Sequence, residues 1–333
     1  MAVAPEDIAV LLNPNARRVD DAVLDRIGEL VDPEHLYVSE DEHRAAMMLD
    51  EIVAKGYGTI FAGGGDGTVT QVINQLLDDD GGPRVGILKL GTGNAMAEIV
   101  SSGDPMVDLQ TYTANPSTDA HTLRLCEAED TRFAFAGLGI DASILNDYRD
   151  LKARYGDGVM KPVLQNLGGY LAAALGVTIP GLVASWLRRS TVEATITNLG
   201  DTAHVIGHDE LGGRIERSIA PGEVLYHGPA NTVMFGTCPF YGYAMKVLPF
   251  AGLDPDRYHL RICNVPAPLL VANMGGLWDG SYQHEQIYDY HVDTVHIAFS
   301  EPMPYQMAGE AMGYRNSLTV GLSESSVELV RFI

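Results

Sequence analysis

The sequence is poor in basic residues, and this shortage limits the partners that the protein can bind. Its 333 residues include 22 Lys and Arg against 44 Asp and Glu, which gives a formal net charge of −22 at pH 7. Binding to a nucleic-acid backbone depends on basic stripes, so this charge argues against a nucleic-acid partner. It would also repel an anionic membrane, unless the charge is distributed unevenly along the chain.

Cysteine is also scarce, and the N-terminus lacks a secretory signal. Cys126, Cys238 and Cys263 lie far apart and belong to no Cys-x-x-Cys or Cys/His ligand pattern. We therefore expect neither a disulfide framework nor a zinc site. Glu6 and Asp7 stand where a signal peptide would carry basic residues and then an unbroken apolar run. The sequence thus predicts a cytoplasmic protein.

The length and the hydrophobic pattern predict two domains. In residues 1–122, apolar strand patterns alternate with amphipathic helix patterns, which is typical of a layered α/β domain. Strands are expected at 8–12, 59–62 and 85–90, and Asp20 is a candidate helix cap. Residues 123–314 predict a mostly antiparallel domain. Short β-rich runs from there to the chain end are at 192–197, 224–227, 232–235, 259–263, 269–272, 295–299, 318–320 and 327–332.

One segment departs from the acidic composition. Residues 149–189 contain six basic residues and two acidic ones, and residues 162–187 contain no charged residue. A bilayer-spanning helix needs about 20 apolar residues. Asparagine, glycine and proline interrupt the stretch, so we favour a buried helix pair or an apolar surface that meets a lipid over a transmembrane helix.

The clearest chemical pattern is the first glycine loop, Gly63-Gly64-Gly65-Asp66-Gly67-Thr68, between a predicted strand and an amphipathic helix. Glycines let the backbone approach a phosphate, and the free N–H groups of a helix start favour negative charge. The loop fits neither a Walker motif nor GxGxxG. A carboxylate in such a loop would repel phosphate unless it holds Mg²⁺ or accepts hydrogen bonds from hydroxyls. Both roles suit a nucleoside triphosphate.

A second glycine loop, Leu90-Gly91-Thr92-Gly93-Asn94, follows the next predicted strand. Loops after neighbouring strands meet at the carboxyl edge of an open α/β sheet, where such sheets bind ligands. The two loops together therefore indicate one nucleotide site.

These patterns resemble the diacylglycerol kinase catalytic family, the lipid kinases that include sphingosine and ceramide kinases and are distant relatives of NAD kinases. The resemblance implies an α/β nucleotide-binding domain over 1–122, completed by residues 315–333, and a β-sandwich domain over 123–314, with the active site between them. The matching residues are Asn13-Pro14, the GGGDGT run at 63–68, LGTGN at 90–94, Gly139-Ile140-Asp141-Ala142, Asn146-Asp147-Tyr148-Arg149 and Gly309-Glu310.

The resemblance also implies an activity, transfer of the γ-phosphate of ATP to a lipid hydroxyl with Mg²⁺. Asp66, Asp141 and Glu310 would be catalytic, with Asp66 and Glu310 near the metal. The nucleotide would contact Asn13, Gly64, Gly65, Asp66, Gly67, Thr68, Gly91, Thr92, Gly93 and Asn94, with Arg149 and Arg154 on its phosphates.

The chain departs from the family at three carboxylates, which are replaced by Gln71, Ala95 and Ala308. Lys89 also replaces a usual proline. The base is therefore left open between Asp141 and Glu310. Two other functions also stay open: a kinase of a soluble metabolite, and a non-catalytic nucleotide-binding regulatory protein.

Each remaining candidate has a structural alternative. Asp141 could cap a turn, Arg149 and Arg154 could form a solvated helix face, and Glu310 could simply be exposed. The expected partners are a lipid substrate and, transiently, a membrane surface that meets residues 149–189. A homodimer is left open.

Overall fold

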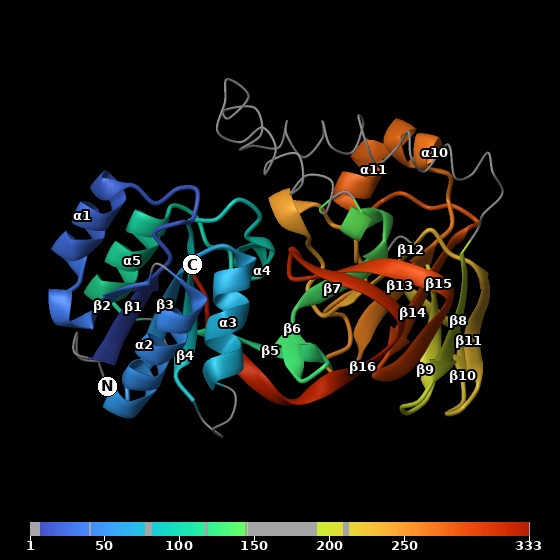
Figure 1. The fold of residues 1–333 in the computed structure, drawn as a ribbon, viewed down its shortest axis with the longest axis horizontal. Coiled ribbons are helices and arrows are strands. Elements are labelled where there is room, and N and C mark those ends of the chain that lie inside the picture. Colours follow the sequence, from blue (N-terminus) through green and yellow to red (C-terminus); the bar gives the residue numbers. More distant parts are fainter. Residues whose placement is uncertain are drawn as a thin grey trace. The chain divides into compact units, whose positions relative to one another are not determined.

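The structure, a computed structural model, describes residues 7–39, 41–76, 82–116, 119–143, 145, 192–208 and 213–332. The chain divides into two compact units (Figure 1). Unit 1 comprises Met1–Leu125, Gly242–Ala244 and Ser323–Ile333, and unit 2 comprises Cys126–Tyr241 and Met245–Leu322.

Unit 1 is built on a parallel sheet with the strand order β2-β1-β3-β4-β16. Strands β1 and β3 are buried along their whole length, as expected for parallel strands covered on both faces. The strands are β1 (Ile8–Leu12), β2 (Leu36–Val38), β3 (Thr59–Gly64), β4 (Arg84–Lys89) and the end of β16 (Glu310–Val330).

Helices cover both faces of this sheet, α1 and α5 on one side and α2 and α3 on the other (Figure 1). In α3 the predicted apolar stripe is the buried face, with Val69, Val72, Ile73 and Leu76 buried. Asp20 caps α1 as predicted, because its carboxylate accepts the Val23 N–H at 2.9 Å. The helices are α1 (Asp21–Leu30), α2 (Glu42–Lys55), α3 (Asp66–Leu76), α4 (Ala95–Ile99) and α5 (Pro105–Ala114), with a 3₁₀ turn η2 (Pro33–His35).

Unit 2 is mostly antiparallel, so the predicted fold class is confirmed. Strand β7 lies between β12 and β15, and this trio positions the candidate residues described below. The elements of unit 2 are β6 (Thr131–Phe133), β7 (Phe135–Gly139), β8 (Glu193–Asn198), β9 (Ala203–Gly207), β10 (Arg214–Ile219), β11 (Val224–Pro229), β12 (Thr232–Gly236), β13 (Tyr258–Cys263), β14 (Ile287–Val292), β15 (Thr294–Met307), the start of β16, α10 (Ala267–Ala272) and α11 (Met274–Asp279). Strand β5 (Ala120–Ala128) begins in unit 1 and ends in unit 2, and the turn η4 (Gly242–Ala244) belongs to unit 1.

The prediction of a strand at 269–272 is wrong, because these residues lie in α10. A short apolar run of Leu, Val and Ala has no periodicity that separates a strand from a buried helix turn. Pro266 is at the N-cap position, and Pro268 lies in the first turn, where a proline is compatible with the start of a helix.

Unit 2 buries an ion cluster around Asp289, whose side chain is 3% exposed. Its carboxylate accepts two hydrogen bonds from Arg261, at 2.6 and 3.0 Å. His259 Nε2 and His208 Nε2 lie 2.8 and 2.9 Å from it. Although burial opposes the charge, the Arg261 guanidinium and the two imidazoles hold the pKa of Asp289 well below its usual range. The cluster therefore buries a compensated charge.

Several predictions fall outside the described residues. The motif at 146–149, Arg154 and the uncharged stretch 162–187 are among them. Within the part of the chain that the structure describes, no helix is both long enough and apolar enough to cross a membrane.

Candidate functional site

The two glycine loops lie side by side at the carboxyl ends of β3 and β4, which pair in parallel. A Cβ built on Gly91 would lie 2.2 Å from the Cα atom of Gly65, so the two loop backbones are in direct contact. A Cβ on Gly64 would likewise lie 2.4 Å from the Oγ1 atom of Thr68. Glycine is therefore required at 64 and 91 by close packing within and between the loops.

Asp66 links the two loops. Its side chain is 8% exposed, and its Oδ1 atom accepts the Met96 N–H at 3.2 Å. The backbone N–H groups of Asn94 and Ala95 also hydrogen-bond to this carboxylate. Asn94 adopts a left-handed conformation and its own side chain does not cap α4, so Asp66 from the first loop caps that helix instead. Burial outweighs these hydrogen bonds and raises the pKa of Asp66 to about 6.

Asn94 maintains the shape of the second loop. Its Oδ1 accepts the Gly91 N–H at 3.1 Å, and its Nδ2 donates to the Gly91 carbonyl at 2.8 Å. The side chain is 3% exposed. Within the same loop Thr92 is exposed, and a Cβ on Gly93 would lie 2.9 Å from Asp66 Oδ2. Asn94 thus closes the turn, and Gly93 leaves space for the carboxylate.

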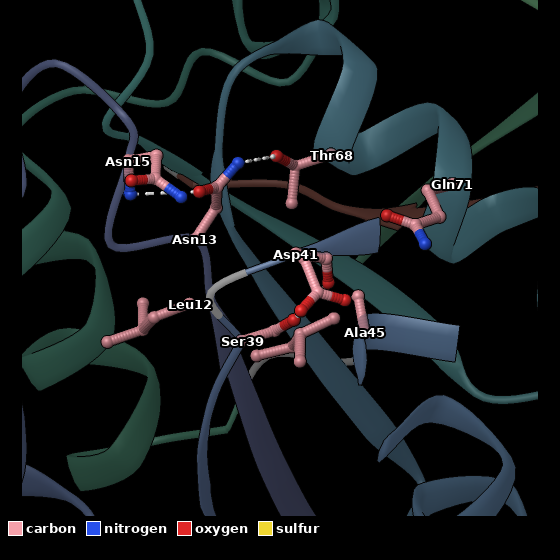
Figure 2. Close-up of a pocket in the computed structure, with 9 residues that line it drawn as sticks. Leu12, Asn13, Asn15, Ser39, Asp41, Ala45, Thr68 and Gln71 are labelled. Carbon is pink, nitrogen blue, oxygen red and sulfur yellow. Dashed lines mark hydrogen bonds between the residues drawn. The ribbon is translucent and has the colours of Figure 1, made fainter. Parts of the chain in front are cut away.

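Asn13 and Thr68 lie beside a cavity of about 220 Å³ in unit 1 (Figure 2). Asn13 Nδ2 donates to Thr68 Oγ1 at 3.3 Å, and Asn13 Oδ1 accepts the Asn15 N–H at 2.9 Å. The pair therefore joins the end of β1 to the start of α3. The cavity is lined by Leu11, Leu12, Asn13, Asn15, Ser39, Asp41, Ala45, Thr68 and Gln71.

Ser39 and Asp41 are cavity residues that the sequence analysis missed. Both follow the short strand β2, and Ser39 Oγ donates to the Asp41 carbonyl at 2.6 Å. Asp41 caps α2 by accepting the Arg44 N–H at 2.8 Å. The available signal was their place after a strand that neighbours β1, because all carboxyl ends of a parallel sheet share one edge.

Arg18 supplies positive charge close to the second loop. Its backbone N–H donates to the Leu90 carbonyl at 3.0 Å, and its Nη1 donates to the Lys89 carbonyl at 3.4 Å. Lys89 itself forms an ion pair with Glu98 of α4. An exposed guanidinium at this edge suits an anionic ligand.

In unit 2, Asp141 follows β7 and its side chain is partly exposed. Oδ1 accepts a hydrogen bond from Thr232 Oγ1 at 2.9 Å, and Oδ2 accepts one from Gln306 Nε2 at 3.2 Å. Removal from water raises the pKa of Asp141, against the effect of these hydrogen bonds. The backbone N–H groups of Asp141 and Ala142 also bond to the carboxylate, as in the turn-capping alternative.

The remaining predicted site residues lie apart from these two groups or outside the described residues. Glu310 is exposed at the start of β16, after a turn in which Ala308 and Gly309 have φ values of 49° and 83°. Gly67 lies in the first turn of α3. Arg149 and Arg154 lie outside the described residues. The described side chains include no group of three or more His, Cys, Asp and Glu residues that could hold a metal ion.

Residues 7–125 match the family model of the diacylglycerol kinase catalytic domain. The resemblance predicted from the glycine loops is therefore confirmed over this segment, which is similar to the diacylglycerol kinase catalytic domain. Two relatives are each described as "Probable lipid kinase YegS-like". The protein from Enterobacter sp. (strain 638) is 34% identical over 110 residues, and the one from Citrobacter koseri is 38% identical over 111 residues. Each match covers 32% of this chain and 36% of the relative.

The fold extends the likeness beyond that segment. A crystal structure described as a diacylglycerol kinase from Bacillus anthracis str. Sterne superposes with a TM-score of 0.64. The alignment covers 98% of this chain and 97% of that chain at 15% sequence identity. The fold is therefore shared over nearly the whole chain.

Proposed function

We propose that the protein is an ATP-dependent kinase that transfers the γ-phosphate to the hydroxyl group of a lipid. The observation that carries the proposal is the contact of Gly91 with Gly65, which places two glycine loops together at the start of α3. Backbone N–H groups at such a helix start favour a phosphate. The similarity of residues 7–125 to lipid kinases supports a lipid acceptor.

The cavity beside Asn13 suits the sugar end of the nucleotide. At about 220 Å³ it is smaller than a whole ligand pocket, for which about 300 to 1,000 Å³ is usual. Ser39 and Asp41 offer oxygen atoms that accept hydrogen bonds from ribose hydroxyls, and the charge of the Asp41 carboxylate would repel a phosphate. We therefore assign the hydroxyl-bearing end of ATP to this cavity and the phosphates to the glycine loops.

The surroundings of Asp66 and Glu310, the predicted metal ligands, fit a direct contact with Mg²⁺ poorly. The Asp66 carboxylate is buried and faces the N–H groups that begin α4, while Glu310 is exposed at the start of β16. A hard cation requires oxygen ligands that are free to turn toward it. No step of the proposed reaction is assigned to a protein-bound ion.

We propose Asp141 as the residue that handles the acceptor hydroxyl. A general base needs a carboxylate that is held in place, reachable, and basic enough near neutral pH. Asp141 is partly exposed, it accepts hydrogen bonds from Thr232 and Gln306, and partial removal of its carboxylate from water raises its pKa. Glu310, the other candidate, is exposed at the start of β16, after the left-handed turn at Ala308 and Gly309.

The direct test is a phosphotransfer assay with [γ-³²P]ATP and three acceptors: dispersed diacylglycerol, dispersed sphingosine and water-soluble glycerol. The proposal expects label in the organic phase with wild type and its loss with Asp141→Asn. Label only in the aqueous product would favour a soluble-metabolite kinase. ATP binding in calorimetry without label in any product would favour a non-catalytic protein.

Because a lipid acceptor resides in a bilayer, the proposal includes transient contact with a membrane surface. Flotation with neutral and with anionic vesicles measures this contact. If the protein floats with neither vesicle but is fully active on lipid dispersed in detergent, the proposed membrane contact is wrong and the proposed lipid kinase activity stands.

A further inference from the structure

The carboxylate of Asp141 is held from two neighbouring strands. Thr232 begins β12 and Gln306 lies near the end of β15, and these strands pair with opposite edges of β7. Both side chains are buried, at 5% and 3% exposure. Each oxygen of Asp141 accepts one hydrogen bond from these side chains, Oδ1 from Thr232 at 2.9 Å and Oδ2 from Gln306 at 3.2 Å. The carboxylate plane is therefore fixed by two donors that the chain supplies from distant segments.

Gly137 makes this arrangement sterically feasible. A Cβ built on Gly137 would lie 1.8 Å from Asp141 Oδ2, so the carboxylate occupies the space that a side chain at this position of β7 would fill. Gln306 is the register partner of Gly137, which places its amide beside the same oxygen. The absence of a side chain at 137 lets the carboxylate turn back toward the Gln306 amide.

Gln306 also connects the carboxylate to the turn that precedes Glu310. Its Oε1 accepts the Gly309 N–H at 3.0 Å while its Nε2 donates to Asp141. Ala308 and Gly309 both have left-handed φ values, 49° and 83°, and such a turn needs support from its surroundings. One amide thus holds the carboxylate with one end and the turn with the other.

We propose that Gln306 and Thr232 are positioning residues for Asp141, and that Gln306 couples the orientation of this carboxylate to the conformation of the turn at residues 308–310. The reading of Asp141 as the base rests on the proposed function. The donors are neutral, so they orient the carboxylate without cancelling its charge. Each oxygen also keeps acceptor capacity for the hydroxyl of a substrate.

The variant Gln306→Glu distinguishes the roles of the two hydrogen bonds that Gln306 makes. A glutamate keeps an acceptor for the Gly309 N–H but loses the donor to Asp141 and faces it with a like charge. We expect kcat to fall about 10- to 100-fold with KM for ATP unchanged, and the acidic limb of the pH profile to move to higher pH. A wild-type kcat and pH profile would overturn the proposal, because a residue that only held the turn would tolerate this change.

Thr232 provides a matched pair of variants. Thr232→Val removes the hydroxyl and keeps the shape, and Thr232→Ser keeps the hydroxyl and removes a methyl group. We expect Thr232→Val to lower kcat and Thr232→Ser to keep a kcat close to that of wild type. Equal activity of the two would overturn the role of Thr232. Gln110→Glu, an exposed position on α5, controls for the added charge, and thermal unfolding of every variant controls for folding.

A second measurement decides the positioning role without any kinase activity. The Asp141 carboxyl carbon can be titrated by ¹³C NMR and assigned by its absence in Asp141→Asn. Loss of a donor, with or without an added charge, raises the pKa of this group, so Gln306→Glu and Thr232→Val should move its titration to higher pH. An unmoved titration overturns the proposal. A moved titration with an inactive wild type would instead refute the proposed function.

Discussion

Unit 1 and unit 2 each hold a carboxylate that the sequence analysis predicted to be catalytic, and they hold it by different means. Asp66 in unit 1 faces backbone N–H groups at the start of α4. Asp141 in unit 2 is held largely by two side chains from neighbouring strands. The geometry of the site in unit 1 therefore depends on the path of the backbone. The geometry of the site in unit 2 depends on the functional groups of particular side chains.

This difference predicts different sensitivities to mutation. An added methyl group should damage the glycine loops of unit 1, where backbones touch. An isosteric change of a polar group should damage the Asp141 site, where the shape is preserved but a donor is lost.

Asp141→Asn should give the largest loss of activity. The amide cannot take a proton from the acceptor, so we expect kcat to fall about 10²- to 10⁴-fold. Burial raises the pKa of Asp141, and the ionised form is the base, so wild-type activity should decline as pH falls through that pKa. Steady-state kinetics against pH measures both effects. Full activity of this variant would show that Asp141 is not the general base.

Asp289→Ala should affect stability, which separates a structural carboxylate of unit 2 from Asp141. The change leaves Arg261 buried and unpaired, which costs about 3 to 5 kcal/mol. The folded-state pKa of Asp289 lies below its unfolded value, so its stabilisation is present at neutral pH and is lost as pH falls through the folded pKa. Urea unfolding at several pH values checks this, and an unchanged midpoint would contradict it.

Gly91→Ala tests the backbone contact in unit 1, with Gly65→Ala as its matched control. The new Cβ at 91 would lie 2.2 Å from Gly65 Cα, whereas a Cβ at 65 would lie 3.7 Å from Gly91 Cα. We expect a cost of about 1 to 3 kcal/mol for Gly91→Ala, together with weaker ATP binding. The control should change stability by less than about 0.5 kcal/mol. Thermal unfolding compares the stability of the two variants, and an equal loss would mean that the loops do not touch. Calorimetry measures ATP binding by Gly91→Ala.

Asp66→Asn should change stability least and in the opposite direction. Burial raises the pKa of Asp66 from 3.8 to about 6, so the folded state binds more protons between these values. Its stability contribution therefore falls as pH rises through this range. The neutral amide avoids that cost but loses part of the helix cap, and we expect a net gain of about 1 kcal/mol at pH 7. Denaturant unfolding at pH 4 and 7 measures it, and a loss of stability at pH 7 would show that the cap dominates.

The same contrast explains which parts of the site could be predicted from the sequence. The loops around Asp66 are contiguous motifs after strands whose ends share one edge, so local patterns were sufficient. The partners of Asp141 lie 91 and 165 residues away in the chain, and no local pattern relates Thr232 or Gln306 to it. The role of Asp66 as the cap of α4 was missed for the same reason, because the cap comes from another loop.

The last strand has a consequence for the synthesis of the chain. Unit 1 contains the first 125 residues, but its sheet is completed by the end of β16, where Leu329 pairs with Val85 of β4. Until residues 323–332 leave the ribosome, the edge of β4 has no β16 to pair with, and an open parallel edge invites pairing with other chains. The sheet that residues 7–125 begin is thus completed only by residues 323–332, so premature termination anywhere in unit 2 would release a nascent sheet whose β4 edge can pair with other chains.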